Sequence, residues 1–244
     1  MQRGWWCLFL VTALLLFFVQ VSASSIETTL PTGLRTERLS PKDQLRWNNI
    51  ESLIFAQSPD GQWLHPTLIN LWQWVETSGH VVYVEFSRSN NILTSTAGQF
   101  RIERLDPRGE RHIGVISLNL SSIDAAYIGA DAQRPLGFIP FDKLKQNERY
   151  AEVLGHEMAH AADILTSLDR VAKVEEFVQK TNELLMHHRS LKPTEKITRD
   201  LMNRLDRRDE LLKTLEAAAD RAEAVVWREL VASKVIRERL TARR

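Results

Sequence analysis

Residues 154–161 read Leu154-Gly155-His156-Glu157-Met158-Ala159-His160-Ala161 and contain the pattern H-E-x-x-H. Residues four apart on a helix project from the same face, so the two imidazoles can bind one metal ion. Glu157 reaches the same site without being a ligand, which is the position of a general base for a metal-bound water. The pattern therefore predicts a metal-dependent hydrolase.

The sequence around this pattern is typical of a helix. Residues 147–165 contain no proline, and apolar residues recur at helical spacing through Val153, Leu154, Met158 and Leu165. A chain of this length carries H-E-x-x-H by chance on the order of once in a hundred. Two histidines and a glutamate on a buried helix would also need polar partners if no metal were bound. A metal site is the favoured interpretation.

A catalytic zinc site usually has three protein ligands and leaves the fourth position to water. The extended pattern with a later glycine and third histidine is absent, and the only cysteine, Cys7, lies in the N-terminal apolar segment. A carboxylate from a second helix remains. Of the glutamates after His160, only Glu216 is followed four residues later by an aspartate, Asp220. Such a pair can supply both a ligand and a partner for the other ring nitrogen of a ligating histidine.

Other assignments of the third ligand stay open at this point. Glu216 could instead lie on a solvated helix face and pair with Lys213 or Arg221. Asp163, one turn after His160, would have to reach back along its own helix. His187 or His188 could also be recruited, but adjacent helical residues point about 100° apart, so at most one would face the site.

The two segments, H-E-x-x-H and Glu216-Ala217-Ala218-Ala219-Asp220-Arg221, together resemble the gluzincin clan of zinc metallopeptidases. The signature of that clan is H-E-x-x-H followed on a later helix by E-x-x-x-D. The resemblance covers two short segments and implies an α+β, zincin-like fold: a small antiparallel or mixed sheet, an active-site helix and a largely helical C-terminal half. It also implies one Zn²⁺ per chain, bound by His156, His160 and Glu216, with Asp220 hydrogen-bonded to His156.

The activity that this resemblance implies is hydrolysis of peptide bonds in a peptide or protein substrate. Zinc polarises the scissile carbonyl and lowers the pKa of its bound water towards about 7. Glu157 takes the proton as general base and passes it to the leaving amine. A further donor to the oxyanion is expected, and the candidates are Tyr127, Tyr150, His187 and Arg221. The alternative is a non-catalytic exported helical protein that keeps a zincin fold to bind a metal or a partner.

The N-terminus has the features of an export signal. Arg3 precedes an apolar run from Trp5 to Val19, and Val21-Ser22-Ala23 supplies small residues for a signal peptidase. We expect residues 1–23 to be a signal peptide, which gives a periplasmic or secreted protein. If the signal is not cleaved, residues 5–21 would anchor the chain to the membrane, although the run is shorter than the roughly 20 residues that a spanning helix needs.

Composition sets the remaining expectations. We expect residues 24–45 to form a polar tether or early loop, and residues 46–244 a single zincin-like metallopeptidase domain. Lys and Arg number 32 against 31 Asp and Glu, and the basic residues of the C-terminal third alternate with acids. This pattern is typical of solvated helix faces and does not indicate a nucleic-acid partner. The sequence does not predict an oligomeric state.

The pattern along the chain predicts helices over 47–57 and 67–75, then a strand over 80–86. Residues 100–105 and 112–120 look like the arms of a hairpin whose turn is Asp106-Pro107-Arg108-Gly109. Residues 121–145 are irregular in composition, and the rest is almost entirely helical. This order of elements is similar to that of the gluzincin core, and the resemblance implies an edge strand that lies along the cleft and pairs with an extended substrate. We place that strand within 113–120.

Overall fold

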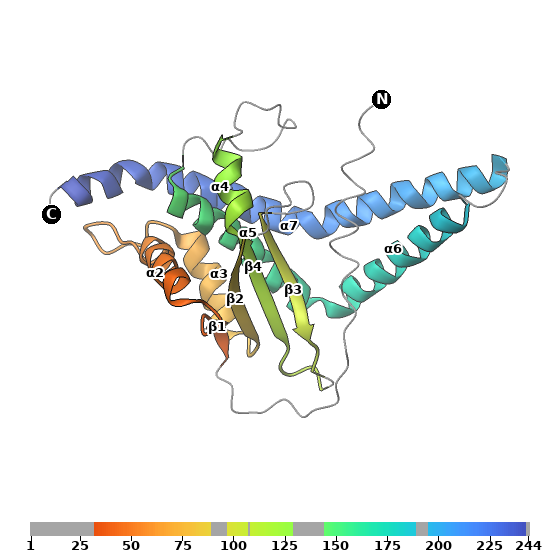
Figure 1. Ribbon diagram of the computed structural model, residues 1–244, viewed down its shortest axis with the longest axis horizontal. Helices are drawn as coiled ribbons and strands as arrows, with labels where there is room; N and C mark the ends of the chain where they lie inside the picture. Colours follow the sequence, from red (N-terminus) through yellow and green to blue (C-terminus); the bar gives the residue numbers. More distant parts are fainter. Residues whose placement is uncertain (1–31, 89–96, 107, 129–143, 189–194, 243–244) are drawn as a thin grey trace. The chain divides into compact units, whose positions relative to one another are not determined.

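The computed structural model describes residues 32–88, 97–106, 108–128, 144–188 and 195–242 (Figure 1). Its elements are β1 (Gly33–Arg35), α2 (Pro41–Ile54), α3 (Pro66–Thr77), β2 (Val81–Ser87), β3 (Gly98–Arg104), β4 (Ile113–Asn119), α4 (Leu120–Ile128), α5 (Gln146–Thr166), α6 (Leu168–His188) and α7 (Glu195–Ala242). A small mixed sheet lies in the N-terminal half, and the C-terminal half is largely helical. The expected α+β class is confirmed.

The described residues form two compact units. The larger unit holds the sheet, the first part of α5 up to Ala162, and the last part of α7 from Ala219 onward. The smaller unit comprises Asp163–Ala218, with α6 and the first part of α7. Both boundaries fall inside helices, so α5 and α7 each continue from one unit into the other.

The sheet has the strand order β1-β2-β4-β3. β1 and β4 both run parallel to β2, and β3 runs antiparallel to β4. The predicted hairpin is therefore confirmed, and in its turn the Gly109 amide donates to the Asp106 carbonyl at 2.9 Å. Gly109 has a φ of +74°, a conformation that favours glycine.

The prediction that residues 113–120 form the edge strand is wrong. β4 lies between β2 and β3, and β3 is at the edge. The reason is visible in the composition of β4: Ile113, Val115, Ile116 and Leu118 are all buried, and a strand that is apolar on both faces belongs inside a sheet. The edge strands are β1 and β3. In β3, the charged residues Arg101 and Glu103 alternate with Phe100 and Ile102.

Part of the segment expected as a tether or early loop is regular structure. Gly33–Arg35 forms β1 beside β2, and α2 begins at Pro41, earlier than the expected residue 47. The Ser40 side chain accepts a hydrogen bond from the Asp43 amide, and Pro41 occupies the first turn, where its missing N–H costs nothing. Ser40-Pro41 is typical of a loop but also of the start of a helix, which is why α2 begins earlier than expected. β1 is only three residues long, too short to show the alternation of a strand.

The expected signal peptide, residues 1–23, lies outside the described residues, as do residues 24–31. Within the part of the chain that the structure describes, no helix is both long and apolar enough to cross a membrane.

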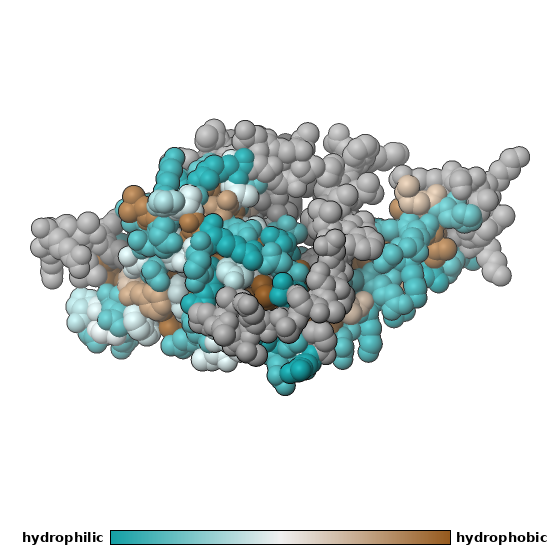
Figure 2. Space-filling view, turned by 60° about the horizontal axis from the view of Figure 1, so that its bottom comes forward, coloured by the Kyte–Doolittle hydropathy of each residue, from teal (hydrophilic) through white to brown (hydrophobic). Residues whose placement is uncertain are grey.

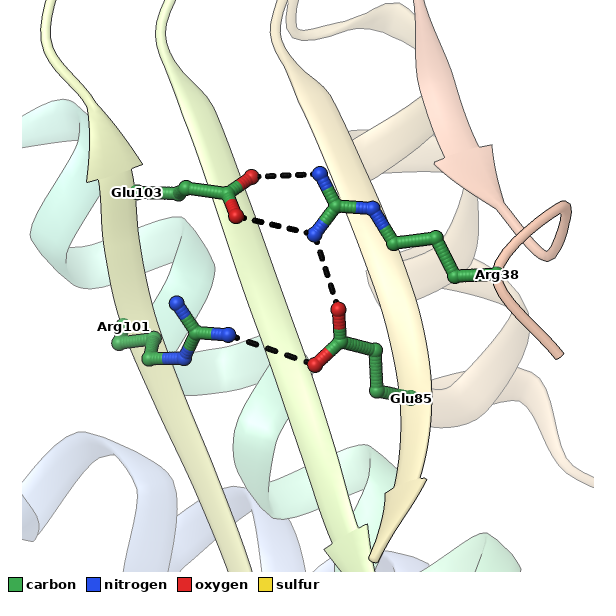
Figure 3. Close-up of polar contacts among 4 residues, drawn as sticks. All are labelled: Arg38, Glu85, Arg101 and Glu103. Carbon is green, nitrogen blue, oxygen red and sulfur yellow. Dashed lines mark hydrogen bonds and ion pairs between the residues drawn. The ribbon is translucent and has the colours of Figure 1, made fainter.

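The sheet has one polar face. Arg38 donates to Glu85 at 2.8 Å and to Glu103 at 2.6 Å, and Arg101 donates to Glu85 at 3.3 Å (Figure 3). The Arg38 guanidinium also lies 3.8 Å from the centre of the Tyr83 ring and lowers the pKa of Glu103 by hydrogen bonding to it. Helices lie behind the strands in Figure 3, on the opposite face. In the view of Figure 2 the coloured surface is mostly hydrophilic, with hydrophobic residues in separate patches.

Two stacked histidines lie at the end of the sheet where β2 and β4 begin. The rings of His80 and His112 are 5.0 Å apart, and the residues are 9% and 4% exposed. The His112 amide donates to His80 Nδ1 at 3.2 Å, and the Asp106 amide donates to His112 Nδ1 at 3.1 Å. Both Nδ1 atoms are acceptors, so both rings are neutral. Burial lowers the pKa of both imidazoles, and the neighbouring His112 lowers the pKa of His80 further.

We expect this pair to make the protein less stable below about pH 6.5, the ordinary pKa of histidine. At such pH values the unfolded chain binds protons that the folded pair does not. The free energy of unfolding therefore decreases as the pH is lowered, by up to about 1.4 kcal/mol per pH unit for each histidine. Urea unfolding of the metal-free protein between pH 7.5 and 5 measures the slope. The double variant His80→Gln/His112→Gln should have a shallower slope; an equal slope would show that the pair does not contribute.

Candidate metal centre

The H-E-x-x-H pattern lies on α5, as the sequence predicts. At the start of the helix, the Glu148 carboxylate accepts a hydrogen bond from the Lys145 amide at 2.7 Å. Leu154, Met158 and Ala161 are fully buried and fix one face of the helix in the core of the larger unit. His156 and His160 lie on the border of this face and are partly exposed.

The two histidine rings converge on one point. Nε2 of His156 lies 3.1 Å from Nε2 of His160, and the ring planes make an angle of 74°. Two nitrogens held 2.0–2.1 Å from one zinc ion and separated by this distance would make an angle of about 100° at the metal, close to tetrahedral. The pair therefore has the arrangement of two ligands of one ion.

Carboxylates from α7 reach the same histidine within the larger unit. Nδ1 of His156 lies 2.8 Å from Oε2 of Glu223. His156, Asp220 and Glu223 each offer a ligand atom, and these atoms lie within 4.8 Å of one another. These three side chains could hold a metal ion. The geometry alone does not identify the ion.

Glu216, the predicted third ligand, lies on α7 one turn before Asp220 and is partly buried. Four residues on a helix place both carboxylates on one side of α7. The alternative ligand Asp163 is in an ion pair with Arg170. His187 is exposed on α6, and the side chain of His188 lies outside what the structure describes.

Glu157, the predicted general base, is only 4% exposed. Its carboxylate lies against the first residue of the edge strand β3, because a Cβ atom on Gly98 would be 2.6 Å from Glu157 Oε1. It would also be 2.7 Å from Val153 Cγ1, so a side chain at residue 98 cannot be accommodated without displacing α5 residues. The start of β3 therefore passes directly beside the candidate base.

The structure removes one candidate for the oxyanion donor. Tyr150 is fully buried, and its hydroxyl donates to Asp124 at 2.8 Å and accepts a hydrogen bond from Arg46 at 2.9 Å. Burial, with the Asp124 contact, raises the pKa of Tyr150 to about 12. Tyr150 thus joins α2, α4 and α5 in a structural network. Arg221 and His187 are exposed, and the side chain of Tyr127 lies outside the described residues.

The sequence reasoning missed Glu223. It follows Glu216 by seven residues and Asp220 by three, and both spacings place residues on one helix face. This helical spacing could have indicated Glu223 from the sequence. The pattern E-x-x-x-D ends at Asp220, however, and does not include Glu223.

No protein-family model matches the chain, and comparisons with curated proteins and with solved structures found no match either. Any functional assignment therefore depends on the residues of the centre.

Proposed function

We propose that the protein is a zinc-dependent metallopeptidase, with one Zn²⁺ per chain bound by His156, His160 and Glu216. The observation that carries the proposal is the 3.1 Å separation of the two Nε2 atoms. Two imidazoles and one carboxylate are the ligands of a common class of catalytic zinc site that leaves a position for water. The intact Glu157 favours a catalytic site, because a structural zinc site would not need it.

The chemistry divides between the ion and the protein. When bound, zinc supplies a water of lowered pKa and polarises the substrate carbonyl. Glu157 accepts the proton of the attacking water and delivers it to the leaving amine. Its low exposure, 4%, keeps bulk water from competing for that proton. An extended peptide would pair with the edge strand β3, whose first residue lies beside Glu157.

The proposed substrate is a peptide or a protein segment in extended conformation. The proposed location is outside the cytoplasm, because residues 1–23 have the pattern of an export signal. No nucleic-acid partner is proposed.

Metal removal tests the proposal. We expect purified protein to contain one zinc per chain by atomic emission and to cleave members of a quenched-fluorescence peptide library. Cleavage should be lost on dialysis against a chelator and restored by one equivalent of Zn²⁺, because the attacking water depends on the ion. Protein without zinc, or cleavage that survives chelation, would refute the proposal. One zinc per chain with no cleavage of any library member would favour the non-catalytic alternative.

A further inference from the structure

We propose that Glu223 is the positioning residue for His156: its carboxylate accepts the Nδ1–H of this imidazole and so directs Nε2 to the metal. This inference rests on the proposed zinc site. It differs from the arrangement implied by the gluzincin resemblance, in which Asp220 has this role.

The two ring nitrogens of His156 face different groups. Nδ1 lies 2.8 Å from Glu223 Oε2 in an ion-pair contact, whereas Nε2 lies 3.1 Å from His160 Nε2. A neutral imidazole has one N–H and one lone pair. If Nδ1–H donates to Glu223, the lone pair is on Nε2, on the side where the two histidines converge. A carboxylate on the other nitrogen also raises the basicity of a ligating imidazole.

The side chains of Glu223 and Asp220 differ in their exposure to solvent. Asp220 is exposed, and water competes for its carboxylate. The side chains of His156 and Glu223 are only 18% and 22% exposed, so their contact is partly shielded from solvent. A contact of that kind fixes a ring orientation better than an exposed one, because solvent screens it less.

The packing of α5 against α7 holds Glu223 beside His156. A Cβ atom on Gly155, the residue before His156, would lie 3.2 Å from Val226 Cγ2 and 2.9 Å from Leu68 Cδ2. The absence of a side chain at residue 155 therefore lets α7 approach α5 closely, one turn beyond Glu223. Farther along α7, Glu229 accepts hydrogen bonds from the Thr67 amide at 3.1 Å and the Thr67 hydroxyl at 2.6 Å. These contacts fix the position of α7 along its axis.

The test compares Glu223→Gln and Glu223→Ala with Asp220→Asn, a matched change one turn away. In the metal-free full-length protein, ¹H–¹⁵N NMR reports the tautomer of His156, assigned as the imidazole signal missing from His156→Gln. We expect Glu223→Ala to lose the Nδ1–H signal and Asp220→Asn to keep it. Zinc affinity, measured by competition with a chromophoric chelator, should fall about 10–100-fold in Glu223→Ala, and by less in Glu223→Gln and in Asp220→Asn.

The outcomes separate this inference from the proposed function. Wild-type protein that binds no zinc would refute the proposed function, while the NMR comparison would still test the contact in the metal-free state. An NMR signal and zinc affinity that respond to Asp220→Asn and not to the Glu223 variants would overturn the inference. A second equivalent of zinc that disappears in Glu223→Gln would also overturn it, because Glu223 would then be a ligand. Glutamine has nearly the shape of glutamate and keeps one acceptor oxygen. Glu223→Gln therefore still tests the inference if the alanine variant does not fold.

Discussion

Glu157→Gln is expected to reduce peptide cleavage about 10²–10⁴-fold while the protein keeps its zinc. Glutamine has nearly the shape of glutamate but cannot accept the proton of the attacking water, and general base catalysis contributes a factor of this size. The measurement is kcat/KM on a peptide that the wild type cleaves, together with zinc content by atomic emission. KM should change little if the loss is confined to proton transfer.

The neighbouring residue Glu152 provides a matched control. It lies on the same helix and is buried at 1% exposed, but it is one turn before the H-E-x-x-H pattern. Glu152→Gln should affect stability more than cleavage per folded molecule. Equal loss of kcat/KM in both variants, with zinc retained, would mean that Glu157 has no specific part in the reaction.

Glu216→Ala is expected to lose zinc, and with it all zinc-dependent cleavage. Removing one of three protein ligands should weaken zinc binding by more than the roughly 10–100-fold that loss of an outer partner costs. His160→Ala should behave in the same way, and the affinity is measured by chelator competition. Glu210→Ala removes an exposed glutamate from the same helix and should leave zinc binding unchanged.

A different result would reassign the third ligand. If Glu216→Ala keeps full zinc affinity and activity, the gluzincin arrangement does not apply to this chain. Asp220 and Glu223, whose carboxylates lie near His156, would then be the candidates. Asp220→Ala and Glu223→Ala would identify the ligand, because only the true ligand should abolish binding.

Local patterns predicted much of the fold. The helical spacing of apolar residues predicted α5, the Pro66 start predicted α3, and the Asp106–Gly109 turn predicted the β3–β4 hairpin. These features depend on residues close in sequence, where periodicity and turn chemistry decide the conformation. The convergence of His156 and His160 also follows from their spacing on one helix.

Features that depend on distant residues were not predictable in this way. β1 is three residues long and exists because β2, almost fifty residues later, provides its partner. The position of β4 inside the sheet depends on how three strands assemble, and the burial of Tyr150 depends on Arg46 and Asp124. The contact of Glu223 with His156 requires the packing of α5 on α7, which Gly155 permits. None of these has a signature within a short window of sequence.

The capping of α3 by Glu229 has a consequence for biosynthesis. Thr67 and Glu229 are 162 residues apart, and a chain emerges from the ribosome at about 5–20 residues per second. The start of α3 therefore remains without its carboxylate cap until residue 229 has been made. Glu223 emerges only shortly before Glu229, so His156 also waits for its partner. A growing chain therefore carries H-E-x-x-H well before it carries the carboxylate of α7 that lies beside His156.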